Sequence, residues 1–382
     1  MIDRKRNITI LFTGGGSGGH LYPLLAVVDE LTRICREDYI ALEAYYMGPQ
    51  DKFRPLIESR GMKTIWISGG KWRRYFSIEN FFDIPKMFIG LIQAMIKMFF
   101  IMPDAIFSKG GTGALPVIVA GWFYRIPIII HESDATPGVT NLLSARFASR
   151  IAVGFQAALP YFHPQKTAWI GNPIGQDLIG LQPSQEEAKE SLGFDKTKPL
   201  LAIIGGSQGA QKINEFMLQN LKALLEKTQI YHQTGRDNFE EVQKLSRAVI
   251  IETPLQGQTG NRYVAVSYIE KDMKTVLVAA DLVVCRAGSN TISELAAFHK
   301  PAVLIPLGSA ANDHQRANAY EFSKTGAAVV IEENNLLPGI FLSQINSILG
   351  DPTALLRMSE ASKNFYKPGA AEIIAREIIA VA

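Results

Sequence analysis

The chain has 382 residues, of which 47% are hydrophobic and 20% charged, and its formal net charge is +3 at pH 7. This composition is globular and excludes disordered, collagen-like and coiled-coil architectures. The length favours two domains, and the small net charge gives no reason to expect a nucleic-acid partner. Cys35 and Cys285 form neither a disulfide framework nor a metal-ligand spacing, so we expect reduced thiols in a cytosolic protein.

Short apolar segments alternate with helical patterns along the chain. Near-continuous apolar strands are typical of parallel sheets covered on both faces, so the sequence predicts doubly wound α/β units. The expected strands are 8–13, 41–48, 105–108, 126–131 and 151–153 in the first half, and 200–205, 229–233, 248–252, 282–285, 302–305 and 328–331 in the second.

Both halves begin with a strand, a glycine turn and a helix start. A polar stretch punctuated by prolines, 181–199, lies between them, so the domain link is placed near 171–181. We predict an N-terminal domain over 1–172, a C-terminal domain over 173–365, and a last helix over 366–382 that is apolar enough to pack back on the first domain. Two Rossmann-like domains facing each other form a cleft, where ligands commonly bind.

The first glycine loop, residues 14–19, matches the dinucleotide-binding spacing G-x-G-x-x-G after a strand. Such a site needs an acid at the end of the second strand to hold the ribose. Here Glu43 lies inside that strand, and Asp51 follows a proline turn. A nicotinamide or flavin site is therefore disfavoured, and no cofactor is expected.

Two further junctions lie in the second half. Residues 205–210, Gly-Gly-Ser-Gln-Gly-Ala, suit either an anion-binding loop or a tight turn. At 281–295 a strand, a small polar turn and a helix follow one another. Ser289 or Asn290 is expected to cap that helix, leaving backbone amides for a diphosphate. Glu294, placed on its first turn, either reaches a sugar diol or closes a capping box.

Six motifs follow one another along the chain. They are Thr-Gly-Gly-Gly-Ser-Gly-Gly-His at 13–20, His-Glu-Ser-Asp-Ala-Thr-Pro-Gly at 131–138, Gly-Asn-Pro at 171–173, the 205–210 loop, Cys-Arg-Ala-Gly at 285–288 with Glu294, and His-Gln-x-x-Asn-Ala at 314–319. Taken in order, these motifs resemble the MurG family of inverting GT-B glycosyltransferases. No single motif is decisive, but six in order are specific, and the resemblance covers nearly the whole chain.

The resemblance implies UDP-N-acetylglucosamine as donor and undecaprenyl-diphospho-muramoyl-peptide as acceptor. The product would be the β-1,4-linked disaccharide on the same lipid, in peptidoglycan synthesis and hence in cell-wall biogenesis. The N-terminal domain would face acceptor and membrane, and the C-terminal domain would hold the nucleotide. The protein would be peripheral, on the cytoplasmic face of the cell membrane.

The resemblance also assigns the site by position. Ser207 would contact the UDP portion, Ile269 would meet uracil through its backbone, Glu294 would hold the ribose, and Gln315 would bind the N-acetylglucosamine hydroxyls. The diphosphate would be cradled by Gly288, Ser289, Asn290, Thr291, Ile292 and Ser293. In the N-terminal domain, Ser17, Gly18 and Gly19 would line the cleft, and Asp134 and Asn141 would contact substrate.

Two positions depart from the family pattern. Asp134 stands where the family usually has asparagine, and Gly175 stands where it often has arginine. The second departure removes an anion partner, for which Arg286 is a candidate replacement unless its role is structural.

The transfer needs a base for the acceptor hydroxyl. His20 is favoured because it adjoins the glycine loop and imidazole titrates near neutral pH; the alternative is a histidine bonded to backbone or phosphate at a helix start. His131 and Glu132 are weaker candidates, since a strand-end pair can be architectural. Loop amides would stabilise the leaving diphosphate. Because no Asp-x-Asp, H-E-x-x-H or paired-cysteine pattern occurs, we predict single displacement without a metal.

Residues 63–102 interleave lysine and arginine with aromatic side chains, which suits an anionic bilayer surface. The basic members include Lys71, Arg73 and Arg74. Phe99–Met102 is expected to serve the core instead. The most apolar stretch, 84–102, holds a proline and two lysines, so a membrane-spanning helix is not expected.

Other functions remain open from sequence. One is a GT-B transferase with another lipid acceptor, and another is a non-catalytic module that holds a nucleotide or a lipid head group. A UDP-sugar epimerase shares the architecture but not the motifs.

Overall fold

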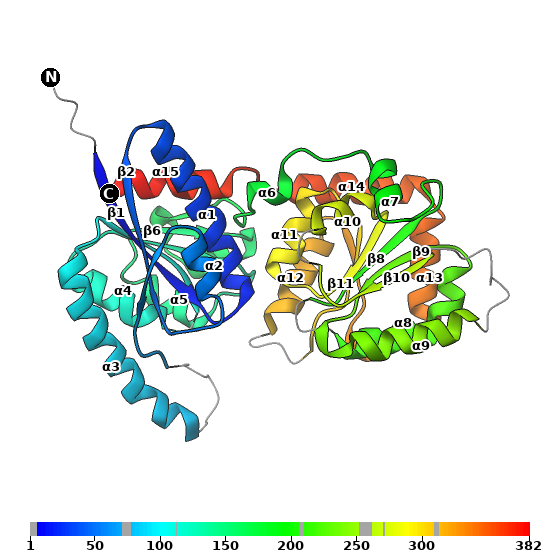
Figure 1. The fold of residues 1–382 in the computed structure, drawn as a ribbon, viewed down its shortest axis with the longest axis horizontal. Helices are drawn as coiled ribbons and strands as arrows, with labels where there is room; N and C mark the ends of the chain where they lie inside the picture. The colour runs from blue at the N-terminus through cyan, green and yellow to red at the C-terminus, as the bar shows by residue number, and fades with distance from the viewer. Residues whose placement is uncertain are drawn as a thin grey trace. The chain divides into compact units, whose positions relative to one another are not determined.

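The computed structural model describes residues 6–70, 78–111, 113–206, 210–251, 262–269, 272–308 and 313–382. The chain divides into two compact units: unit 1 is Met1–Gln176 with Lys367–Ala382, and unit 2 is Asp177–Tyr366. Each unit is a parallel sheet covered by helices, which confirms the predicted fold class (Figure 1).

Unit 1 is built on a parallel sheet in the order β3-β2-β1-β4-β5-β6-β7. Its strands are β1 (Asn7–Gly15), β2 (Ala41–Gly48), β3 (Lys63–Trp66), β4 (Ala105–Gly111), β5 (Ile128–Glu132), β6 (Arg150–Val153) and β7 (Thr167–Trp169). Its helices are α1 (Gly18–Glu37), α2 (Arg54–Ser59), α3 (Ile78–Ile101), α4 (Ala114–Phe123), α5 (Val139–Ser144) and α15 (Ala370–Val381), and α6 (Gln176–Ile179) begins at the unit boundary.

The two faces of this sheet carry separate apolar cores, because successive strand side chains point to opposite faces. On one face, Ile10 and Phe12 of β1 pack with α1 and with Ile374 of α15. On the other, Leu11 packs with residues of α3 and α4, including Met98. Fully burying one such side chain stabilises the fold by roughly 1.5–3 kcal/mol. The last helix therefore completes the α1 side of unit 1, to which it belongs in space.

Unit 2 has a parallel sheet in the order β10-β9-β8-β11-β12-β13. Its strands are β8 (Leu200–Ile204), β9 (Gln229–Gln233), β10 (Tyr263–Val266), β11 (Leu282–Cys285), β12 (Ala302–Leu304) and β13 (Ala328–Val330). Its helices are α7 (Gln185–Ser191), α8 (Gln211–Leu225), α9 (Phe239–Ile251), α10 (Met273–Ala279), α11 (Ser289–Ala297), α12 (His314–Ser323), α13 (Pro338–Leu349) and α14 (Pro352–Phe365).

The strand expected over 248–252 is wrong. Residues 248–251 form the last turn of α9, where Val249 and Ile250 pack on the unit 2 core and Ile251 is exposed. A short apolar run does not distinguish a strand from one buried helix face. The sheet position is taken instead by β10. The edge strands β3 and β7 were also not predicted, because they are short and only partly buried.

Each unit holds one cysteine. Cys35 lies on α1 in unit 1, and Cys285 ends β11 in unit 2. Both thiols are free and buried, and burial raises the pKa of each above its ordinary value. Neither cysteine forms a disulfide in this structure.

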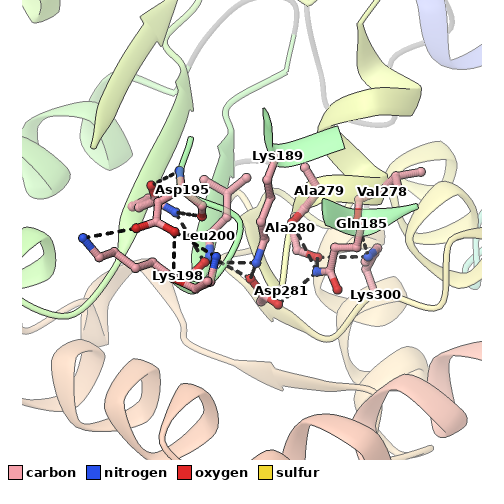
Figure 2. Close-up of polar contacts among 12 residues, drawn as sticks. Gln185, Lys189, Asp195, Lys198, Leu200, Val278, Ala279, Ala280, Asp281 and Lys300 are labelled. Carbon is pink, nitrogen blue, oxygen red and sulfur yellow. Dashed lines mark hydrogen bonds and ion pairs between the residues drawn. The ribbon is translucent and has the colours of Figure 1, made fainter. Parts of the chain in front are cut away.

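A polar network ties the amino ends of β8 and β11 together (Figure 2). Asp281 accepts hydrogen bonds from the Leu200 amide at 2.7 Å and from Gln185 Nε2 at 2.9 Å, and it pairs with Lys189 Nζ at 2.8 Å. The Lys189 side chain is only 6% exposed. Lys300 donates to the carbonyl of Val278, in the last turn of α10, and to that of Ala280, the C-cap of the helix. The network satisfies backbone groups that two strands and a helix end would otherwise leave unpaired.

Replacing Asp281 with asparagine is expected to reduce the free energy of unfolding by about 3 kcal/mol, because the buried Lys189 charge loses its counter-charge. Urea unfolding of the full chain, followed by circular dichroism, measures the change. The matched control is Glu190→Gln on the same helix, whose pair with Lys196 is exposed on both sides and is worth less than about 0.5 kcal/mol. Equal losses in the two variants would contradict this account.

Candidate functional site

The glycine loop of unit 1 is held closely against its sheet. Gly14 and Gly16 have φ of 132° and 87°, which favour glycine. A Cβ added at Gly15 would lie 2.5 Å from the Tyr46 hydroxyl oxygen, and that hydroxyl donates to the Gly14 carbonyl at 2.5 Å. Ser17 is the N-cap of α1, but its side chain makes no cap hydrogen bond. The loop therefore exposes backbone at the start of a long helix.

His20 lies in the first turn of α1, beside a second pair of glycines. A Cβ at Gly111 would lie 2.6 Å from the Gly15 carbonyl oxygen and 3.2 Å from Cδ2 of His20. Gly111 ends β4, and its φ is 84°. The His20 amide donates to the Ser17 carbonyl at 3.2 Å. The structure thus brings His20 together with Ser17, Gly18 and Gly19 at the carboxyl ends of β1 and β4.

A lysine that sequence analysis missed is buried beneath this loop. Lys109 is 1% exposed, and its Nζ donates to Nδ1 of His131 and to Oγ of Ser133, both at 2.5 Å. Burial lowers its pKa to about 7, against the opposing effect of Glu132 and Asp134. The available signal was a single lysine between the apolar residues of β4 and two glycines.

His131 and Glu132 have internal roles. His131 is fully buried; Nε2 donates to the Gly171 carbonyl at 2.9 Å, which leaves Nδ1 to accept from Lys109. Burial holds the pKa of His131 well below its usual value. Glu132 accepts from the amides of Asp134 and Gly138 at 2.9 and 3.0 Å. These contacts favour the architectural interpretation of the pair over a catalytic one.

Of the two other predicted contacts in unit 1, Asn141 is the more buried. Asn141 is 4% exposed, and its Nδ2 donates to Glu132 at 3.0 Å and to the His131 carbonyl at 3.2 Å. Its Oδ1 faces Gly110, where a Cβ would lie 2.5 Å away. Asp134 is partly buried, and its backbone amide contacts Glu132. In this arrangement Asn141 supports the loop that carries Asp134.

In unit 2, the turn after β11 places six predicted residues at the start of α11. Gly288 is the N-cap, so the prediction that Ser289 or Asn290 caps the helix is wrong. Ser293 Oγ donates to the Ser289 carbonyl at 2.8 Å. Oδ1 of Asn290 is buried and has no hydrogen-bond partner among the residues that the structure describes. With Thr291 and Ile292, these residues form a helix start with no side-chain cap, whose first amides remain for a ligand.

Glu294 lies on the second turn of α11, not the first, because the N-cap is Gly288. The capping-box alternative is therefore wrong, since that glutamate must stand three residues after the N-cap. Among the described residues, the Glu294 carboxylate makes no hydrogen bond or ion pair. Burial raises its pKa to about 7. A partly buried carboxylate without a partner is a candidate ligand contact.

Residues of α12 and of the segment after β10 complete the candidate site of unit 2. Oε1 of Gln315 accepts from the Leu307 amide at 3.0 Å, which leaves its NH₂ group as a donor. Ile269 is 5% exposed and follows β10. Asn318 donates to the Ala287 carbonyl at 3.3 Å and so joins α12 to the turn before Gly288. Ser207 lies outside the described residues.

Arg286 was a candidate anion partner, and the structure assigns its guanidinium to protein groups. It donates to Glu333 Oε1 at 2.5 Å and to the Ile305 carbonyl at 3.1 Å. The structural alternative therefore holds for Arg286. In the part of the chain that the structure describes, no group of three or more histidine, cysteine, aspartate or glutamate side chains could hold a metal ion.

Comparison with known proteins accounts for both units. Residues 10–153 match the glycosyltransferase family 28 N-terminal domain, and residues 200–374 match the C-terminal domain of that family. A Bacillus cereus protein is 38% identical over 86% of this chain and 87% of its own length. It is named UDP-N-acetylglucosamine–N-acetylmuramyl-(pentapeptide) pyrophosphoryl-undecaprenol N-acetylglucosamine transferase 2. The chain belongs to this family of N-acetylglucosaminyltransferases, the MurG family.

More distant relatives agree with this assignment. A Clostridium botulinum transferase of the same name, without the final number, is 35% identical over 93% of this chain and 94% of its own. The crystal structure of Acinetobacter baumannii MurG has a TM-score of 0.75 and 25% identity, and the match covers 98% of this chain and 99% of that one. A UDP-GlcNAc 2-epimerase from Neisseria meningitidis, at 10% identity and a TM-score of 0.64, shares the fold alone.

The raised pKa of Glu294 gives a pH test of its environment. In the unfolded chain the carboxyl titrates near 4.5, and in the folded protein near 7. Ionisation therefore costs folding stability progressively as pH rises from about 4.5 to 7. We expect Glu294→Gln to raise Tm by roughly 4 °C at pH 8 and to leave it nearly unchanged at pH 5. Thermal unfolding at both pH values is the measurement, and a gain that is equal at the two would contradict the shift.

Proposed function

We propose that this chain transfers N-acetylglucosamine from UDP-N-acetylglucosamine to undecaprenyl-diphospho-N-acetylmuramoyl-peptide, forming the lipid-linked disaccharide of peptidoglycan. The observation that carries the proposal is identity of 35–38% with transferases named for this reaction, along 84–94% of the chain. Family membership at this identity, on both units, supports the same donor and acceptor.

In the proposed mechanism, unit 2 binds the donor. The start of α11, from Gly288 to Ser293, receives the diphosphate, because its amides and helix dipole stabilise the negative charge that grows as the glycosidic bond breaks. Glu294 accepts hydrogen bonds from the ribose hydroxyls. Among the described residues, its carboxylate has no protein partner. Gln315 offers its NH₂ to the sugar, and Ile269 meets the uracil through its backbone.

Unit 1 handles the acceptor. His20 takes the proton of the acceptor hydroxyl while that oxygen attacks the anomeric carbon and UDP leaves, so the anomeric configuration inverts in one displacement. His20 is favoured over His131 because His131 is fully buried and already bonded through both nitrogens. Ser17, Gly18 and Gly19 present backbone to the acceptor beside His20.

The test is product formation from labelled UDP-N-acetylglucosamine and a short-chain acceptor analogue. His20→Ala is expected to lower kcat by about 10²–10⁴-fold, the usual contribution of a general base, with a small change in the donor KM. Glu294→Ala is expected to act mainly on the donor KM. Near-normal turnover in His20→Ala would show that the base is another residue.

Controls separate the remaining alternatives. Leu356→Ala, an exposed side chain on α14, is expected to leave turnover unchanged. Nucleotide binding without product would favour a non-catalytic module, and turnover only with another glycolipid would favour a different acceptor. Activity that disappears in EDTA and returns with Mg²⁺ would contradict displacement without a metal.

We further propose that α3 rests on an anionic membrane surface. In the described part of the chain, no helix is long and apolar enough to cross a bilayer. Along α3, however, and at Met102, which directly follows it, large apolar side chains recur at exposed positions. The prediction that Phe99–Met102 serves the core is therefore wrong for Phe99, Phe100 and Met102, whereas Ile101 is partly buried and packs on the core. The exposed residues are Phe88 (64% exposed), Ile89 (50%), Ile92 (58%), Ile96 (56%), Phe99 (60%), Phe100 (79%) and Met102 (53%).

The spacing and position of these side chains support surface contact. Residues three, four or seven apart share one helix face, so Phe88, Ile92, Ile96 and Phe99 form a stripe. Lys97 is exposed on the same helix, and α3 runs along the outside of unit 1 (Figure 1). A lipid acceptor keeps its tail in the bilayer, so the enzyme must reach it there. Lys71, Arg73 and Arg74 lie outside the described residues.

Replacing both Ile92 and Ile96 with glutamate is expected to reduce partition onto phosphatidylglycerol-containing vesicles by at least about tenfold, since two isoleucines lose burial worth roughly 1.5–3 kcal/mol each. Vesicle sedimentation measures the partition. The matched control is Leu356→Glu, an apolar-to-acid change on unit 2 that should leave binding unaltered. Equal binding by all three proteins would eliminate α3 as the contact.

A further inference from the structure

A carboxylate outside the predicted site joins three of its segments. Glu333 lies in the short 3₁₀ turn Glu333–Asn335 that follows β13, and its side chain is 10% exposed. Oε1 accepts from Arg286 at 2.5 Å, and Oε2 pairs with Lys212 at 3.0 Å. Each oxygen therefore holds a cation from a different segment of the chain.

The Arg286 contact reaches the turn before α11 and the loop after β12. Arg286 stands two residues before the N-cap Gly288, at the point where β11 ends. Its guanidinium also donates to the carbonyls of Ile305 at 3.1 Å and Pro306 at 3.5 Å. Directly after these residues, the Leu307 amide donates to Gln315 Oε1. One guanidinium thus fixes the exit of β11 against the segment that orients Gln315.

The Lys212 contact reaches the start of α8. Lys212 lies in the first turn of α8, directly after the 205–210 loop. Its amine is 68% exposed and its partner is nearly buried. Gln233 of β9 donates to the carbonyl of Gly206, the last described residue after β8, at 2.9 Å.

The adjacent residue, Glu332, makes contacts with α12. Its carboxylate accepts from Arg316 at 2.8 and 3.0 Å and from the Tyr320 hydroxyl at 3.0 Å. Arg316 follows Gln315 on α12. Two successive carboxylates after β13 therefore contact α8, the β11 turn and α12. The β11 turn leads into the start of α11, and α12 carries Gln315, both of which are proposed to bind the donor.

We infer that Glu333 is a positioning residue for the sugar-nucleotide donor: through Arg286 and Lys212 it fixes the relative placement of the α11 start, the segment that orients Gln315, and the start of α8. The inference rests on the proposed function, in which unit 2 binds the donor. Preorganisation of this kind improves affinity because loops are ordered before the ligand arrives.

The charges are consistent with this role. Burial by itself would raise the pKa of Glu333, but the hydrogen bonds from Arg286 and Lys212 outweigh it and lower the value. The carboxylate is therefore ionised across the neutral range, and its two contacts persist there.

The experiment compares Glu333→Gln with the full-length wild type. Gln keeps the shape and an acceptor for Arg286 and removes the charge. Titration calorimetry with UDP-N-acetylglucosamine is expected to show a Kd raised about tenfold, which corresponds to ~1.4 kcal/mol. In turnover assays the donor KM should rise similarly, while the acceptor KM stays within about twofold. Glu333→Asp, which retains the charge, should recover part of the donor affinity and serves if the Gln variant is poorly folded.

The matched control is Glu321→Gln on α12, which removes an equal charge from an exposed pair with Lys324; donor affinity should be unchanged. A lower Tm for Glu333→Gln with an unaltered donor Kd would assign Glu333 a purely structural role and overturn the inference. Equal changes in donor and acceptor KM would also overturn it. If the wild-type protein does not bind the donor, the proposed function is wrong, and this inference is wrong as well.

Discussion

All strands of a parallel sheet end at the same edge, and this constraint determines where each unit places its functional groups. In unit 1, the exits of β1 and β4 bring Gly111 against Gly15 and His20, while β5 sends His131 to Lys109. In unit 2, the exits of β11 and β13 meet in the pair of Arg286 with Glu333. The candidate sites of both units therefore depend on loops that the sheets bring together.

The buried carboxylates at the two edges of the unit 2 sheet differ in whether they have protein partners. At the amino edge, Asp281 meets Lys189, Gln185 and a backbone amide, so the charge is fully compensated. At the carboxyl edge, Glu294 stands without a partner among the described residues, and burial shifts its pKa to about 7. An uncompensated carboxylate costs stability, which a fold tolerates where a ligand supplies the missing donors.

Much of the architecture was predictable because parallel strands buried on both faces read as continuous apolar runs. β1, β2 and β9 were predicted closely for that reason. The errors fall where the pattern is short: the end of α9 resembles a strand, and the edge strand β3 is only partly buried.

Part of the candidate site was also predictable from the sequence, and part was not. Glycine loops and helix starts are local in sequence, so residues 14–20 and 288–294 could be located before the fold was known. Lys109 bonds to a residue 22 positions away, and Arg286 to one 47 positions away. No periodicity or short motif encodes such pairings; they follow from strand order, which the sequence did not reveal.

The positions of the two cysteines allow the motions of the two units to be measured separately. Unit 1 and unit 2 each contain one buried thiol, Cys35 and Cys285, and burial disfavours the reactive thiolate in both. An alkylating reagent reaches either sulfur only when the surrounding packing opens. The protein therefore carries a native reporter in each half, and the two modification rates separate transient opening of one lobe from that of the other.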